Sequence, residues 1–225
     1  MYILSNNMPR KLNRVQQKQV KDLALSVVKK QSETKNSSFP EENIQLYHHT
    51  PHFHSNMLYT QPGDNSGDRA GTWTIREGDE LYLQHLRLKF WLSNKQDRPN
   101  VIYRILVFWY NSEQAGVMTA NHVLNAMNNM LLNEPNRENI SVIADEYVRN
   151  VGDSQSGREH STLKFINKSW KNKKIVYNDT DTPTAYQPKK RDIGYMVLAY
   201  DAYGTLISDN IASMAVQYDI KYKEN

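Results

Sequence analysis

Residues 100–111 read NVIYRILVFWYN, and this stretch decides the fold class. Eight of the ten residues from Val101 to Tyr110 are β-branched or aromatic, which is the composition of a β-strand. Only Arg104 interrupts the apolar run. Because a strand with two apolar faces is buried on both, we expect a central strand with a sheet on one side and another layer or subunit on the other.

The segment just upstream, residues 80–93, shows the alternation of a half-buried strand. Its sequence is ELYLQHLRLKFWLS, in which Tyr82, Leu86, Leu88, Phe90 and Leu92 share one parity, while His85, Arg87 and Lys89 share the other. The connector NKQDRP is polar and contains Pro99. We therefore expect these two strands to form an antiparallel hairpin.

Further strand patterns follow on both sides, with no alternation of strands and helices. They cover residues 44–60 (interrupted at Pro51), 140–151, 159–166, 173–178, 193–203 and 211–222. Thr119 is placed to cap a short helix with apolar residues Val123, Met127, Met130 and Leu131, which Pro135 ends. The pattern predicts an all-β fold: one eight-stranded antiparallel jelly roll with a short inserted helix, over residues 44–225.

The net charge of +4 is unevenly distributed. Residues 1–36 carry eight lysines and arginines and two acids, so the remaining residues are slightly acidic. We interpret residues 1–43 as a basic N-terminal arm, in which residues 31–43 form a polar linker with Pro40. A basic arm on a nearly neutral domain indicates a polyanionic partner.

Residues 11–30 of the arm lack Gly and Pro and are predicted to be helical. At 100° per residue, Lys11, Arg14, Lys18 and Lys21 lie on one face. The roughly opposite face is apolar, with Leu12, Val15, Val20, Leu23 and Val27. The basic face, with Arg10 just before it, is a candidate for phosphate binding; the alternative is an ordinary amphipathic helix with solvated lysines.

A second basic cluster lies near the C-terminal half. Lys164, Lys168, Lys171, Lys173 and Lys174 surround Trp170, and the segment NKSWKN separates two strand candidates. Lysines around an exposed aromatic ring suit single-stranded nucleic acid, because the charges hold phosphates and the ring stacks on a base. The alternative is a lysine-rich turn with a buried tryptophan. Lys189, Lys190 and Arg191 form a short basic run that is weak evidence for nuclear localisation.

Other constellations do not indicate a catalytic site, a metal or a cofactor. His48, His49, His52 and His54 crowd one segment, but Pro51 breaks it and no cysteine or acid is nearby, so a polar edge or subunit contact is the better interpretation. Asp64 and Asp68 lack the spacing of a calcium loop. The adjacent acids Asp145 and Glu146 would point to opposite faces of a strand. The motifs G-x-S-x-G, H-E-x-x-H and G-x-x-x-x-G-K-[ST] are absent, and no apolar run approaches the roughly 20 residues of a membrane span.

The order of these features from Ser66 to Tyr222 resembles the capsid proteins of small circular single-stranded DNA viruses that encode a replication initiator, the circovirus-like or CRESS-DNA group. The segments that carry the resemblance are GDRAGTWTIREGDELYLQHLRLKFWLS, NVIYRILVFWYN, TANHVLNAM, ISVIADEYV, KFINKSWKNKKIVYN, IGYMVLAYDAY and IASMAVQYDIKYKE. Many members have a long arginine-rich N-terminus, whereas this arm mixes lysine and arginine.

The resemblance implies a structural subunit that assembles with itself into a T=1 shell of about sixty copies around circular single-stranded DNA, or around host nucleic acid when expressed alone. It also implies a location in the virion, with assembly in the host nucleus or cytoplasm, a host cell-surface receptor of unknown identity, and no membrane partner. Two other functions fit a jelly roll: a carbohydrate-binding module or lectin, and a β-sandwich hydrolase. The lectin would need an aromatic platform or a calcium site, and the hydrolase would need an acid pair.

Overall fold

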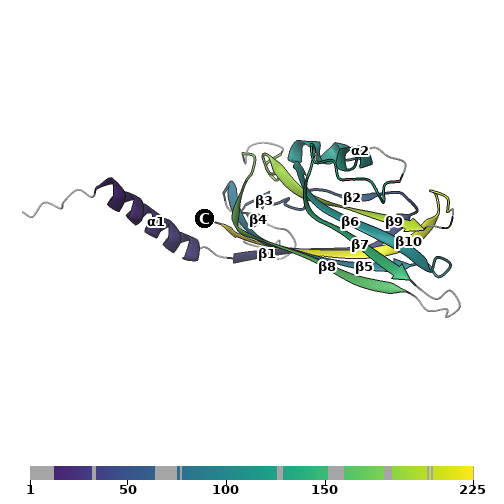
Figure 1. Ribbon diagram of the computed structural model, residues 1–225. Coiled ribbons are helices and arrows are strands. Elements are labelled where there is room, and N and C mark those ends of the chain that lie inside the picture. The colour runs from purple at the N-terminus through teal and green to yellow at the C-terminus, as the bar shows by residue number, and fades with distance from the viewer. Residues whose placement is uncertain are drawn as a thin grey trace, which may run out of the picture. The chain divides into compact units, whose positions relative to one another are not determined.

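A computed structural model describes residues 13–31, 34–63, 75–76, 78–125, 129–151, 160–179, 184–201, 203 and 205–224. The chain divides into two compact units, Met1–Glu33 with Asn225, and Thr34–Glu224. The first unit contains the helix α1 (Arg14–Gln31) and the second contains every strand (Figure 1). Each unit is described separately below.

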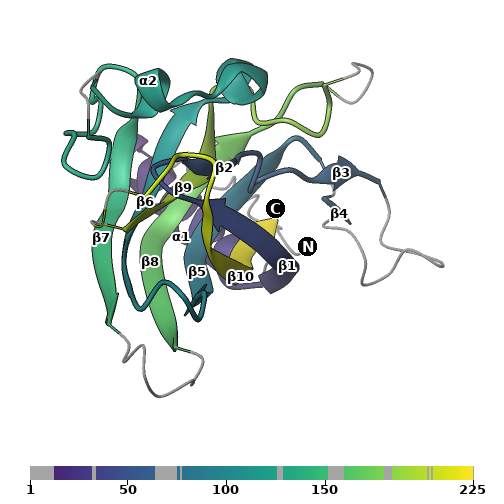
Figure 2. The same ribbon diagram turned by 90° about the vertical axis from the view of Figure 1, so that its right-hand side faces the viewer.

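The second unit is a sandwich of two four-stranded antiparallel sheets (Figure 1). One sheet, which we call the outer sheet, has the order β1-β10-β5-β8, and the other, the covered sheet, has the order β2-β9-β6-β7. The bounds are β1 Thr34–Tyr47, β2 His52–His54, β5 Glu80–Asn94, β6 Asn100–Asn111, β7 Ser141–Val151, β8 Ser161–Val176, β9 Arg191–Asp201 and β10 Asn210–Glu224. Two further short strands, β3 (Gln61–Pro62) and β4 (Ile75–Arg76), pair in parallel and stand apart from both sheets (Figure 2).

This strand order defines the fold as a jelly roll, which confirms the predicted fold class. The first strand of the unit, β1, pairs with the last, β10, and the next strand, β2, pairs with the last but one, β9. The same nesting continues inward, because β5 lies beside both β10 and β8 while β6 lies beside both β9 and β7. Two interleaved Greek keys of this kind make an eight-stranded jelly roll.

The main core lies between the two sheets. The inward-facing residues of β5 are Leu86, Leu88, Phe90 and Leu92, as the alternation predicted. Tyr82 does not belong to this set, because the register shifts between Leu83 and His85 and the buried parity passes to Leu81 and Leu83. A bulge inserts one extra residue and thereby exchanges the two faces of a strand.

Strand β6 is buried on both faces, as its sequence predicted. Val101, Tyr103, Ile105 and Val107 face the core between the sheets. Leu106, Phe108 and Tyr110 face the opposite way and form a second core with Val123, Leu124 and Ile140. The segment after β6, which contains a 3-10 helix (Ser112–Val117) and α2 (Ala120–Val123), therefore supplies the layer that covers this sheet (Figure 1).

The predicted helix after β6 is shorter than expected. Thr119 occupies the N-cap position of α2 but makes no side-chain capping hydrogen bond, and the helix ends at Val123. Leu124 instead forms a β-bridge with Pro135, so Met130 and Leu131 do not continue the helix. Met127 lies outside the described residues.

Two other sequence-based expectations are wrong. The strands β5 and β6 do not form a hairpin: β5 pairs with β10 and β8, β6 pairs with β9 and β7, and residues 95–99 cross from one sheet to the other. A short polar connector containing Pro99 fits either connection, so local sequence did not distinguish them. Residues 34–43 are not a linker but the first part of β1, where Pro40 is tolerated because β1 is an edge strand.

Candidate nucleic-acid interface

The outer sheet has one face that no described segment of its unit covers, in contrast to the covered sheet (Figure 1). Alternation along the strands decides which side chains this face presents. The cations on it are Arg87 and Lys89 on β5, Lys171 and Lys174 on β8, and Lys221 and Lys223 on β10. The acids on the same face are Glu80 and Asp219, together with Glu42, which lines a hollow beside Trp91. The face is therefore basic, although the unit as a whole is not.

Part of this charge is neutralised within the sheet. Lys89 lies 3.1 Å from Asp219, and Lys174 lies 2.6 Å from Glu80. The hydrogen bond to Glu80 raises the pKa of Lys174, so this lysine stays charged. Within the described residues, Arg87, Lys171 and Lys221 form no ion pair, and these three cations are exposed. They are available to an external anion.

Apolar and aromatic side chains lie on the same face toward the other end of β5. Trp91 is 54% exposed, Leu163 is 56% exposed and Phe165 is 42% exposed. Trp91 pairs across the ladder with Leu163, and the guanidinium carbon of Arg87 lies 5.3 Å from the centre of the Phe165 ring. Cations beside exposed rings suit a single strand, because bases stack on rings while phosphates contact the charges.

Sequence reasoning missed this surface, although the sequence carries a signal for it. His85, Arg87 and Lys89 alternate with the buried residues of β5, and Lys221 and Lys223 alternate with those of β10. Neither strand looks basic as a segment, because the apolar residues of the inner face dilute its charge. The basic face forms only when β5, β8 and β10 lie side by side.

The predicted cluster around Trp170 is split between the two faces of β8. Residues 161–176 form one continuous strand, so NKSWKN is not a turn between two strands. Asn172 has a left-handed φ of 54°, opposite the register shift in β5, and the facing parity changes there. Lys171 and Lys174 therefore face outward, whereas Lys164, Lys168, Trp170 and Lys173 have the inward parity.

Three of the four inward members of this cluster contact other residues of the unit. Lys164 lies 3.2 Å from Glu146 on β7. Trp170 packs against the core and contacts Trp109 edge to face, with ring centres 5.7 Å apart. Lys173 lies over the Trp109 ring at 3.8 Å, and burial followed by the nearby charge of Arg191 lowers its pKa. Trp170 is thus placed as a core residue rather than an open stacking platform, while Lys168 is exposed.

The helix α1 carries the predicted basic residues Arg14, Lys18 and Lys21, whereas Arg10 and Lys11 lie outside the described residues. Asn13 begins the helix with a capping box that sequence reasoning missed. The backbone N–H of Gln16 donates to Asn13 Oδ1 at 2.8 Å, and the backbone N–H of Asn13 donates to Gln16 Oε1 at 3.1 Å. Val15, Val20, Leu23 and Val27 are exposed.

Three of the four histidines have separate polar partners. His48 Nδ1 accepts from the backbone N–H of Asp201, His49 Nε2 accepts from that of Met130, and His54 Nδ1 lies 2.8 Å from Glu41. Among the described residues no group of three or more His, Cys, Asp or Glu side chains is placed to hold a metal. Asp64 and Asp68 lie outside the described residues. No described helix is long and apolar enough to cross a membrane.

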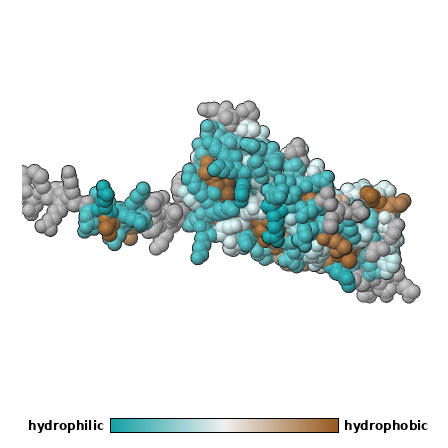
Figure 3. All heavy atoms as spheres, turned by 45° about the horizontal axis from the view of Figure 1, so that its top comes forward, coloured by the Kyte–Doolittle hydropathy of each residue, from teal (hydrophilic) through white to brown (hydrophobic). Residues whose placement is uncertain are grey.

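Asp145 and Glu146 point to opposite faces of β7, as expected for adjacent residues of a strand. Asp145 pairs with Arg104 on the covered side, at 2.7 Å, and Glu146 pairs with Lys164 across the gap between the sheets. The two carboxylates therefore do not face a common substrate. The side of the unit seen in Figure 3 is mostly hydrophilic, with apolar side chains in small separate patches.

Comparison with known proteins gave matches only among solved structures. No protein-family model matches the chain, and no curated protein matches it. A structure of Desmodium yellow mottle tymovirus is similar at a TM-score of 0.34 and 9% identity, over 99% of this chain and 96% of that one. The cryo-EM structure of Mud crab tombus-like virus is similar at a TM-score of 0.37 and 9% identity, over 99% of this chain and 87% of that one.

Proposed function

We propose that this protein is a structural viral capsid subunit, which assembles with copies of itself into a closed shell and holds nucleic acid inside it. The observation that carries the proposal is the combination of an eight-stranded jelly roll with a bare, basic and partly aromatic sheet face. The segment after β6 already covers the covered sheet and forms a second hydrophobic core with it. The bare face belongs to the other sheet and is basic, so it does not need to be covered by a further apolar layer. A charged face with exposed rings is instead suited to a polyanion.

The basic arm supports the same role. Arg14, Lys18 and Lys21 recur at intervals of four and three residues, which places them on one side of α1. We propose that these residues, with Arg10 and Lys11, contact nucleic acid on the inner side of the shell. The apolar side of the helix, from Leu12 to Val27, packs on protein in the same subunit or a neighbour. Phosphate contacts of this kind bind without reading sequence.

The finer features rest on the resemblance in the sequence. We propose a T=1 shell of about sixty copies around circular single-stranded DNA, assembled in the host nucleus or cytoplasm. No catalytic step belongs to this role. Sustained hydrolysis of a glycan or an ester, abolished by one substitution, would contradict it.

The bare sheet face is tested by the triple variant Arg87→Ala, Lys171→Ala, Lys221→Ala. Four arm contacts give a salt slope of about −3 for a single strand, at roughly −0.7 per contact, and three sheet contacts add about −2. We expect the variant to lose the part of the salt slope that the three sheet contacts contribute. We also expect it to package less nucleic acid, measured as the ratio of absorbance at the nucleic-acid and protein maxima. The matching arm variant, Arg14→Ala, Lys18→Ala, Lys21→Ala, is expected to lose a similar part of the salt slope. Unchanged slopes in both would contradict a nucleic-acid interface.

A carbohydrate-binding role is the second candidate, and one observation favours it. Exposed Trp91 borders a hollow of about 260 Å³ that Asn43, Ser93 and Ser213 also line. A ring beside polar groups can hold a sugar. Binding of an oligosaccharide that Trp91→Ala abolishes, by a protein that remains monomeric, would favour this role over the capsid.

A further inference from the structure

A hollow of about 450 Å³ lies at one end of the covered sheet. Three segments that are far apart in the sequence line it: the end of β6 with the residues after it (109–111 and 113), the residues leading into β7 (137–141), and the residues leading into β9 (189–191). The last of these is the basic run Lys189-Lys190-Arg191. The fold thus gives this run a defined place, which its sequence alone did not indicate.

The cations of the hollow are brought together by the fold rather than by local sequence. Arg137 comes from one wall, and Lys190 and Arg191 come from another. Arg191 pairs with Asn111 in the ladder between β9 and β6, and the Lys190 carbonyl accepts from the backbone N–H of Ser112. The backbone of Lys190 and Arg191 is therefore fixed before any ligand arrives, which reduces the entropy that binding would cost.

The cations that line the hollow outnumber the acids that line it. Within the part of the chain that the structure describes, Arg137, Lys190 and Arg191 form no ion pair, although Glu113 and Glu138 also line the hollow. Lys189 is paired with Asp179 at 3.0 Å. Lys173 adds a further positive charge beside the hollow, because it lies over the ring of Trp109, one of the lining residues.

We propose that this hollow binds a phosphate group, and that the occupant is a phosphodiester of single-stranded nucleic acid. Arginine offers a planar fork of donors to phosphate, and lysine offers a point charge. Trp109 offers no stacking platform for a base, since it is buried and its ring already contacts Lys173 and Trp170. The inference deepens the proposed function and rests on it.

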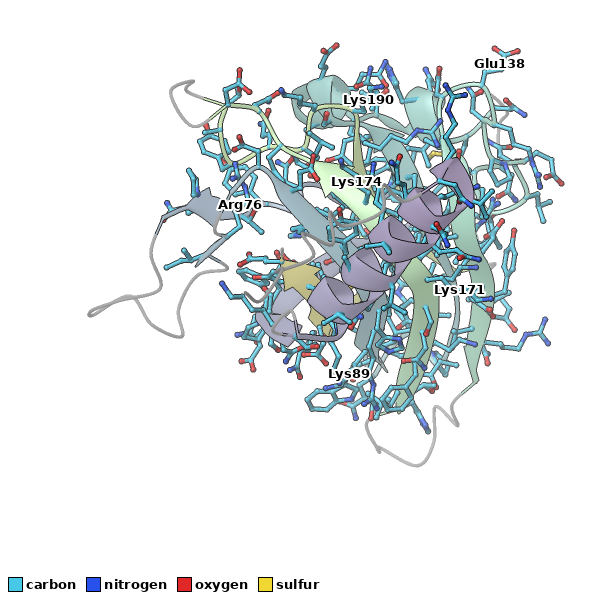
Figure 4. All side chains as sticks on the ribbon, turned by 90° about the vertical axis from the view of Figure 1, so that its left-hand side faces the viewer. Arg76, Lys89, Glu138, Lys171, Lys174 and Lys190 are labelled. Atoms are coloured by element: carbon cyan, nitrogen blue, oxygen red, sulfur yellow. The ribbon has the colours of Figure 1, made fainter. Side chains whose placement is uncertain are left out.

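The position of the hollow favours nucleic acid over a free anion. Lys173 and Lys174 are neighbours on β8, with Lys173 directed inward to Trp109 and Lys174 directed to the bare face of the outer sheet. The end of β8 therefore joins the hollow to the basic face. Figure 4 views the sandwich from this end, where Lys171, Lys174 and Lys190 can be followed. A single strand that crosses the basic face could place one phosphate in the hollow.

The test compares two double variants of the full-length protein that each lose one lysine and one arginine. Lys190→Ala, Arg191→Ala removes the charges of the hollow. Lys95→Ala, Arg149→Ala removes exposed charges at the far ends of β5 and β7. Binding of an oligothymidylate of about ten nucleotides, within the footprint of one single-strand-binding domain, is followed by fluorescence anisotropy across a salt series.

We expect the hollow variant to bind more weakly and to lose about 1.4 from the salt slope, at roughly 0.7 per contact, while the far-end variant keeps the wild-type slope. Equal losses in both variants would overturn the proposal, because net charge alone would then explain binding. Inorganic phosphate that raises the Tm of the wild type but not of the hollow variant, without any difference in oligonucleotide binding, would assign the hollow to a free anion and overturn the proposed occupant. Binding of a sulfated polysaccharide alone would do the same.

Failure of this inference and failure of the proposed function have different signatures. If the sheet variant Arg87→Ala, Lys171→Ala, Lys221→Ala weakens binding and the hollow variant does not, only the hollow is wrongly assigned. If the wild-type chain binds no oligonucleotide at any salt concentration and forms no particle, both proposals fall together.

Discussion

Arg104 is the residue that most changes the interpretation of the central strand. It interrupts the apolar run of β6, yet its side chain is only 2% exposed. It forms a bidentate pair with Asp145, at 2.9 and 2.7 Å, and donates to the carbonyls of Met130, Leu131 and Asn133. The guanidinium thus fastens the covering segment to the sheet, and a buried charge is tolerated because its donors are satisfied.

This arrangement predicts a large effect for Asp145→Ala. Removal of the carboxylate leaves Arg104 charged, buried and unpaired, which typically costs 3–5 kcal/mol, so we expect the free energy of unfolding to fall by about 3 kcal/mol. The neighbouring Glu146→Ala is the control, since its pair with Lys164 is half-exposed and is worth less than about 1 kcal/mol. Urea denaturation measures both. An equal fall in the free energy of unfolding in the two variants would show that the buried charge of Arg104 does not need the Asp145 carboxylate.

Asp192 gives a prediction for pH. It is fully buried at the start of β9, where Oδ1 accepts from the backbone N–H groups of Leu58 and Ile193 and Oδ2 has no partner. Burial raises its pKa to about 7. The folded state therefore keeps a proton that the unfolded state releases near pH 4, so stability is lost as pH rises through this window up to about 7.

The variant Asp192→Asn removes this titration. We expect its stability to fall less than that of the wild type between pH 5 and pH 8, by on the order of 2 kcal/mol, because one pKa unit corresponds to about 1.4 kcal/mol. Chemical denaturation of both proteins at the two pH values gives the difference directly, and other titrating groups cancel in the comparison. If the free energy of unfolding changed equally with pH in both proteins, Asp192 would have the same pKa in the folded and unfolded states, which would contradict the prediction.

At the scale of elements, strand existence was predictable and strand pairing was not. The alternation in β5 and β10 and the doubly apolar run of β6 are local signals, and each gave a strand near its observed bounds. The path of residues 95–99 between sheets depends on which strands meet later in the chain, and no local signal reports that. The register shift between β5 and β8 likewise changes which residues face out, so the lysines that the sequence groups around Trp170 do not share one surface.

The edge strand β1 gives a prediction about where the folded unit begins. Residues 34–41 pair with β10, Phe39 stacks on Tyr218 with ring centres 5.2 Å apart, and Lys35 lies 2.6 Å from Glu224. We compare a chain starting at Thr34 with one starting at Ile44. Loss of residues 34–43 exposes the edge of β10 and removes a packed ring, so we expect the shorter chain to be less stable by more than about 3 kcal/mol.

Thermal unfolding of the two truncated chains provides the measurement. A chain from Thr34 that unfolds cooperatively at a clearly higher Tm than the chain from Ile44 agrees with the observed boundary. Equal Tm values would instead support the linker that the polar sequence QSETKNSSFPEEN suggested. Polar residues such as Asn36 and Ser38 fit this strand because they lie on the bare face of the outer sheet, where they meet solvent.

At the scale of the whole molecule, the class of fold followed from the sequence, while the bare basic face required the sheet order. Composition placed the net charge in the arm, and the structure adds that Arg87, Lys171 and Lys221 gather on one face of the remaining chain. The hollow beside Lys190 could not be foreseen either, since its walls come from three distant segments. Surfaces of this kind depend on tertiary arrangement and leave little trace in any one stretch of sequence.

The central claim is that the jelly roll is a shell-forming subunit that holds nucleic acid. Sedimentation velocity of the full-length protein, recorded at both absorbance maxima across a range of salt and pH, tests it most directly. The account predicts closed particles of megadalton mass, visible by electron microscopy, whose nucleic-acid signal falls in the arm and sheet variants. Monomers or dimers alone, under every condition and without bound nucleic acid, would contradict it.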